Sequence, residues 1–81
     1  MDNNEAMARL TAVFRRIFGD ETLNLTPTTT AKDVPGWDSL MHINLIVAVE
    51  SEFKIHFTSR EIAKLQDVGA LAELVGRKQA S

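Results

Sequence analysis

One serine of this chain stands in an unusual setting, the segment Gly36-Trp37-Asp38-Ser39-Leu40. Pro35 and Gly36 predict a turn before it, and the apolar spacing after it predicts that a long helix begins there. The Ser39 hydroxyl would then point outward, beside free N–H groups and the positive end of the helix dipole. The position is chemically suited to carry a phosphate-linked group, and the Asp38 carboxylate is placed to engage a metal ion or a basic residue of a modifying enzyme.

Two other interpretations of these residues stay open at this point. Ser and Asp are among the commonest N-cap residues, so the motif alone requires nothing beyond helix capping. Ser39 and His42 also lie one helical turn apart, so with Asp38 they could form the nucleophile, base and orienting acid of a hydrolase. A hydrolase also needs an oxyanion site and a pocket that excludes water, and a bundle of 81 residues shows neither in its sequence.

The chain contains no cysteine and two histidines, His42 and His56. Without cysteine there is no disulfide framework, no cysteine-ligated zinc site and no thiol nucleophile. The histidines are far apart in the sequence and lack the spacing and the third ligand that a metal site needs. We therefore expect no metal site.

Length and composition predict one small domain, residues 1–81, with an ordered part at about 4–77. Such a chain has no room for two lobes with a substrate cleft between them. With 9 Lys and Arg against 11 Asp and Glu, it lacks the cationic face that binds nucleic acid. No apolar run approaches the roughly 20 residues that cross a bilayer, and the start does not resemble a signal peptide. We expect a cytoplasmic monomer without membrane insertion or a nucleic-acid partner.

Apolar residues recur at helical spacing in three longer segments and one short one, and no segment reads as a strand. We expect an all-α fold, a small four-helix bundle with a long loop between its first and second helices. The tail from Gly76 onward is expected to fray. The four predicted helices run from an Asn4 cap to Gly19, over 39–53, over about 59–65 and over about 68–77.

Capping residues support the starts of three of these helices. Asp38 or Ser39 can cap the second, Thr58 and Glu61 form a capping box for the third, and Asp67 can cap the fourth. The second helix is apolar almost all round. Either it packs on two sides at the centre of the bundle, or its outer face is used by a partner.

The chain resembles the acyl carrier proteins. The likeness covers roughly residues 4–77, and its parts together are far more specific than the Asp-Ser-Leu triplet alone. It rests on Asp38-Ser39-Leu40, on the helix from Met41 to Phe53, and on Ile55, Phe57, Glu61, Ile62, Leu65, Asp67, Val68 and Leu71 at family-like spacing.

The resemblance implies that Ser39 accepts 4′-phosphopantetheine from coenzyme A, transferred by a separate phosphopantetheinyl transferase with Mg²⁺. The thiol of this arm would hold an acyl or related group as a thioester, which fits a chain without cysteine. An acyl-loading ligase or synthase and further biosynthetic enzymes would be the partners. The domain itself would catalyse nothing.

The resemblance also assigns a docking face and a core to the second helix. The outer, partner-docking side would consist of Leu40, Met41, Asn44, Val47, Ala48 and Ser51. The core, part of which would line a cargo cavity, would consist of Ile43, Ile46, Val49, Phe53, Phe57, Ile62, Leu65, Val68 and Leu71. Trp37, Asp38 and Leu40 are the neighbours of the modified serine.

Two positions depart from the pattern of fatty-acid carriers. Such carriers are usually strongly acidic, whereas Met41 and Asn44 stand here where they carry docking carboxylates. Apolar contacts would therefore take a larger share of recognition. We expect a stand-alone carrier of one dedicated pathway rather than the housekeeping fatty-acid carrier, with polyketide, modified-lipid, surface-polysaccharide and aminoacyl cargo all open. The alternative is an unmodified helical interaction module of the same fold.

Overall fold

The computed structural model of the chain describes residues 3–80, and in this range the secondary structure is helical, without strands. The predicted all-α class, with three longer helices and one short third helix, is confirmed. A single 3₁₀ turn, η1, interrupts the long loop after the first helix. In chain order the elements are α1 (Asn3–Phe18), η1 (Ala31–Asp33), α2 (Ser39–Phe53), α3 (Ser59–Ala63) and α4 (Val68–Ala80).

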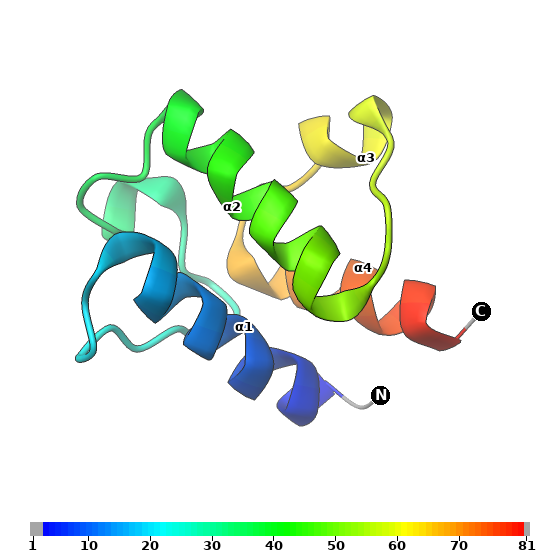
Figure 1. The fold of residues 1–81 in the computed structure, drawn as a ribbon, viewed down its shortest axis with the longest axis horizontal. Coiled ribbons are helices and arrows are strands. Elements are labelled where there is room, and N and C mark those ends of the chain that lie inside the picture. Colours follow the sequence, from blue (N-terminus) through cyan, green and yellow to red (C-terminus); the bar gives the residue numbers. More distant parts are fainter. Residues whose placement is uncertain (1–2, 81) are drawn as a thin grey trace.

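Helix α1 packs against both α2 and α4 and runs antiparallel to each of them (Figure 1). Leu10, Val13 and Phe14 of α1 are almost completely buried, because they recur at the three- and four-residue spacing that keeps side chains on one helix face. The start of α1 and the end of α4 lie at one end of the bundle, and α2 begins at the opposite end (Figure 1). The start of α2 is therefore remote from both.

The assignment of one residue to the predicted core is wrong. The Ile43 side chain is 62% exposed, whereas Leu45, which is not among the expected core residues, is fully buried. A helix turns about 100° per residue, so Ile43 lies on the same side as Leu40 and Val47, away from the buried stripe. That stripe consists of Leu45, Ile46, Val49 and Phe53.

Three predicted helix ends also differ from the structure. Helix α1 already includes Asn3, so Asn4 lies inside it rather than capping it. Helix α3 ends at Ala63, because the N–H of Lys64 turns back to the carbonyls of Glu61 and Ile62. Helix α4 continues to Ala80 instead of fraying from Gly76.

The last turns of α4 are held by side chains from two other parts of the bundle. The Gln79 amide donates a hydrogen bond to the carbonyl of Phe53, and Lys78 pairs with Glu61 of α3. These long-range contacts explain why α4 is longer than the sequence predicts.

The long loop between α1 and α2 is anchored at several points. Leu23 and Leu25 pack against the core. Further along, the carbonyls of Pro27 and Thr29 accept hydrogen bonds from the first N–H groups of α4, at 2.8 and 2.9 Å. The loop thereby supplies acceptors that the start of a helix otherwise lacks.

Candidate functional site

A tight turn delivers the chain to the start of α2. Val34 is buried and anchors the turn, and its carbonyl accepts a hydrogen bond from the N–H of Trp37 at 3.2 Å. Pro35 and Gly36 occupy the two central positions, and Gly36 has a φ of +88°. Pro followed by a residue of positive φ defines a type II turn, which favours glycine at the second position. The sequence pair Pro-Gly therefore fixes where α2 begins.

Trp37 attaches this turn to α1. Its ring meets the Phe14 ring edge-on at 5.3 Å and 81°, and lies 6.2 Å from the Phe18 ring. Its indole N–H donates a hydrogen bond of 3.1 Å to Nδ1 of His42. The half-buried Trp37 thus covers the junction of loop and helices and contacts the first turns of α2.

Ser39 is the first residue of α2, and its side chain is exposed. The cap is Asp38, whose carboxylate accepts a hydrogen bond from the N–H of Met41 at 2.9 Å. Among residues 3–80, the N–H groups of Ser39 and Leu40 have no hydrogen-bond partner. The Ser39 hydroxyl is therefore open to solvent, not consumed by capping, and next to free backbone donors at the positive end of the helix.

A pocket of about 380 Å³ opens beside Ser39. It lies between the start of α2, the turn η1 and the connection from α3 to α4. Its lining is mixed polar and apolar: Ala31, Trp37, Asp38, Ser39, His42, Leu65 and Gln66.

The alternative of a hydrolase finds no support in this geometry. Nδ1 of His42 accepts the Trp37 N–H, and an indole N–H can only donate, so the remaining nitrogen of a neutral ring carries the proton. That nitrogen is a donor and not a base toward Ser39. The Asp38 carboxylate accepts from Met41 rather than orienting the imidazole. The three side chains therefore do not form a relay.

The residues expected at the docking face are unequally exposed. Leu40 is 69% and Val47 is 59% exposed, and Asn44 and Ser51 are also exposed. Met41 is half-buried. Ala48 is also half-buried and packs against the core.

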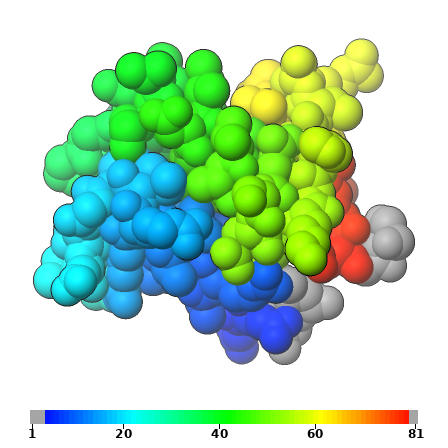
Figure 2. Space-filling view, viewed as in Figure 1, coloured from blue at the N-terminus to red at the C-terminus, as the bar shows by residue number. Residues whose placement is uncertain are grey.

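The exposed side of α2 also includes Ile43, a residue that sequence reasoning missed for this face. Its spacing to Leu40 and Val47, three and four residues, was the available signal. Figure 2 shows α2, in green, running across the upper part of the face turned to the viewer.

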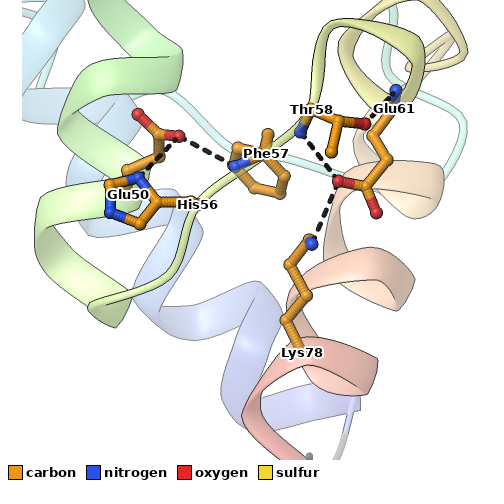
Figure 3. Close-up of polar contacts among 6 residues, drawn as sticks. All are labelled: Glu50, His56, Phe57, Thr58, Glu61 and Lys78. Carbon is orange, nitrogen blue, oxygen red and sulfur yellow. Dashed lines mark hydrogen bonds and ion pairs between the residues drawn. The ribbon is translucent and has the colours of Figure 1, made fainter.

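A second polar cluster holds the segment that follows α2 (Figure 3). The carboxylate of Glu50 accepts a hydrogen bond from the N–H of Phe57 at 2.8 Å and lies 3.7 Å from the His56 ring. The predicted capping box is present, since Glu61 and Thr58 each accept an N–H from the other. The hydrogen bond from the Thr58 N–H, followed by that from Lys78, lowers the pKa of Glu61. This cluster fixes α3 and lies apart from the pocket beside Ser39.

The fold and the exposed serine at the start of α2 define a class of small helical carrier domains. Residues 8–75 match the family model described as phosphopantetheine attachment site. The chain is 47% identical to a holo acyl carrier protein from Geobacter metallireducens, whose solution NMR structure it matches with a TM-score of 0.88. The match covers 93% of this chain and 86% of that one. No curated protein matches the chain significantly. The chain belongs to the acyl carrier protein family.

The prosthetic group of this family is 4′-phosphopantetheine, and the site described here fits it. The group needs an accessible hydroxyl, and Ser39 has one that no side chain or backbone group of residues 3–80 engages. It also needs space beside the attachment point, which the adjacent pocket provides. As a member of this family the chain is a carrier and not a catalyst. None of the helices within residues 3–80 is long and apolar enough to span a bilayer.

Proposed function

We propose that this chain carries acyl or related intermediates as thioesters on a 4′-phosphopantetheine arm attached to Ser39. The observation that carries this proposal is the exposed Ser39 hydroxyl at the first position of α2, with free N–H groups and a pocket beside it. The position falls inside the matched family segment, residues 8–75. A separate phosphopantetheinyl transferase would attach the arm from coenzyme A.

The proposed setting is a dedicated biosynthetic pathway in the cytoplasm, served by a monomeric carrier. An acyl-loading ligase or synthase would charge the arm, and downstream enzymes would then use the cargo. The chain's own contribution is to present Ser39 and to offer each enzyme the same docking face.

We further propose that partners dock on the exposed side of α2. The docking face would comprise Leu40, Ile43 and Val47, together with Met41, Asn44, Ala48 and Ser51. Three exposed aliphatic side chains on one helix side favour apolar contact with a partner. The absence of Lys, Arg, Asp and Glu from these seven positions makes this contact less dependent on salt than an acidic docking face would be.

The attachment is tested by incubating the purified chain with coenzyme A, Mg²⁺ and a transferase, followed by intact-protein mass spectrometry. We expect the mass of one phosphopantetheinyl group to be added, and fragmentation to locate it at Ser39. Ser39→Ala should abolish the addition. Ser59→Ala is a matched control, because Ser59 is also an exposed first residue of a helix, in α3. A wild-type chain that stays unmodified with several active transferases, the cognate one included, would favour the unmodified interaction module instead.

The docking face is tested through the rate of the same transfer reaction. Ile43→Ser and Val47→Ser should each lower kcat/KM about tenfold, the scale of a side chain that contributes more than about 1 kcal/mol to an interface. Ala12→Ser, at an exposed position of α1, should leave the rate unchanged. Equal rates for all three variants would exclude this face from transferase docking.

A further inference from the structure

Trp37 and His42 form a hydrogen bond that determines which imidazole nitrogen carries the proton. Nε1 of Trp37 lies 3.1 Å from Nδ1 of His42. The indole group is a donor only, so Nδ1 is the acceptor and the proton of the neutral ring is on Nε2. The ring planes differ by 21° with centroids 6.0 Å apart, which fits an N–H···N bond lying near the plane of both rings.

Trp37 is itself held from the opposite side. Its ring packs edge-on against Phe14, which is completely buried in α1. Its backbone N–H donates a hydrogen bond to the carbonyl of Val34. Since Trp37 is fixed by α1 and by the turn, it acts as a positioning residue for the imidazole of His42.

The second nitrogen of His42 is free to meet a ligand. Among the described residues, Nε2 has no hydrogen-bond partner, and His42 lines the same pocket as Ser39. Asp38 is the one charged residue in that lining, which contains neither Lys nor Arg. An anion at this place would therefore be met by neutral side-chain N–H donors, His42 and Gln66. Of the two, only His42 is held by a rigid neighbour.

We propose that the Nε2–H of His42 donates a hydrogen bond to the phosphodiester of the arm, with Trp37 as the residue that orients it. This inference rests on the proposed attachment at Ser39. Residues three apart on a helix are neighbours, which places the imidazole within reach of a group on the serine hydroxyl. The consequence is that the base of the arm is held beside the start of α2, while the part that bears the thiol stays free.

Nuclear magnetic resonance of the histidine-labelled chain, before and after modification, tests this contact. In the unmodified chain we expect the Nε2–H form of His42. After modification the Nε2–H proton should move downfield, because hydrogen bonds to a charged acceptor are short and strong. Trp37→Phe keeps a ring against Phe14 but removes the indole N–H, and it should produce a mixture of both imidazole forms.

The phosphorus resonance of the arm gives a second, independent readout. His42→Asn retains an acceptor near Nδ1 but no donor near Nε2, and it should shift this resonance from its wild-type position. His42→Gln carries an amide nitrogen at about the reach of Nε2 and should restore it. His56→Asn is the matched control, because the His56 side chain is 98% exposed on the connection between α2 and α3. It should change neither signal.

The mass of the chain distinguishes a failure of the proposed attachment at Ser39 from a failure of the proposed contact with His42. A chain that gains no phosphopantetheinyl group at Ser39 overturns the proposed function, and this inference with it. If the chain is modified but His42 carries its proton on Nδ1, only the contact with His42 is overturned. The same holds if the Nε2–H and phosphorus resonances do not respond as described. The attachment at Ser39 would then stand.

Discussion

The Nζ atom of Lys78 lies 3.0 Å from Oε1 of Glu61, so a side chain near the end of α4 holds the first turn of α3 (Figure 3). Helix α3 contains no buried residue. Its position therefore depends on this ion pair, on the capping box with Thr58 and on the half-buried Ile62. The order of α3 is accordingly sensitive to the charge of a single carboxylate.

The pH dependence of stability should follow from the lowered pKa of Glu61. Its ordinary value is 4.5, and the hydrogen bonds from Thr58 and Lys78 lower it in the folded chain. A carboxyl group of this kind stabilises the fold above its unfolded pKa, and this stabilisation is lost as the pH falls through the folded pKa. Glu61→Gln should therefore reduce the free energy of unfolding at pH 7 and make little difference well below pH 4.5.

Urea unfolding of wild type and Glu61→Gln at several pH values measures this effect. Glu73→Gln, at an exposed position of α4, serves as the control and should show no such pH-dependent difference. A constant difference between wild type and Glu61→Gln across the pH range would contradict the role of the ionised carboxylate.

Gly69→Ala should destabilise the fold, although helix propensity predicts the reverse. Alanine in a helix is favoured over glycine by about 1 kcal/mol. A Cβ atom at Gly69, however, would lie 2.7 Å from the carbonyl oxygen of Pro27, and that oxygen accepts the Gly69 N–H. Overpacking against a fixed backbone typically costs about 1–3 kcal/mol. Thermal unfolding tests this prediction through the direction of the change in Tm, which we expect to fall. A raised Tm for Gly69→Ala would show that the loop at Pro27 shifts to make room for the added methyl group.

Two substitutions at the start of α2 should separate capping from attachment. Asp38→Ala removes the cap on Met41 and should cost about 0.5–2 kcal/mol of stability. Ser39→Ala should stay within about 0.5 kcal/mol of wild type, because an exposed hydroxyl without a hydrogen bond contributes little. Chemical denaturation of both variants measures the contrast. A larger cost for Ser39→Ala than for Asp38→Ala would assign the cap to the wrong residue.

Neighbouring isoleucines on α2 should respond very differently to truncation. Ile46 is 4% exposed, so Ile46→Ala should lose about 2–5 kcal/mol through buried apolar contacts and the cavity left behind. Ile43 is 62% exposed, so Ile43→Ala should change the stability by less than about 0.5 kcal/mol. Urea midpoints of the two variants provide the comparison. Similar losses would mean that Ile43 is covered in solution.

Much of the fold followed from local signals in the sequence. The bounds of α2 agree with the prediction from Ser39 to Phe53, because a Pro-Gly turn and an Asp cap mark its start. The capping box at Thr58 and Glu61 likewise marked the start of α3. These signals act over three or four residues, so they survive without knowledge of the rest of the chain.

The inner and outer sides of α2 were harder to predict, since apolar residues surround the helix. Which isoleucine is buried depends on where α1 lies, and Ile43 was therefore assigned to the wrong side. The hydrogen bond from Trp37 to His42 could also not be predicted from the sequence. In the fold the indole packs against Phe14 of α1, a contact between residues that are distant in the chain.

The sequence by itself determined a helical domain with Ser39 at the first position of a helix, because caps, turns and apolar spacing are local properties, and its resemblance to the acyl carrier proteins implied the carrier function. The tertiary structure decided which side of that helix faces outward. It also decided that a pocket lined by His42 lies beside Ser39. These features depend on residues that are distant in the chain and become neighbours only when α1, the long loop and α4 pack together.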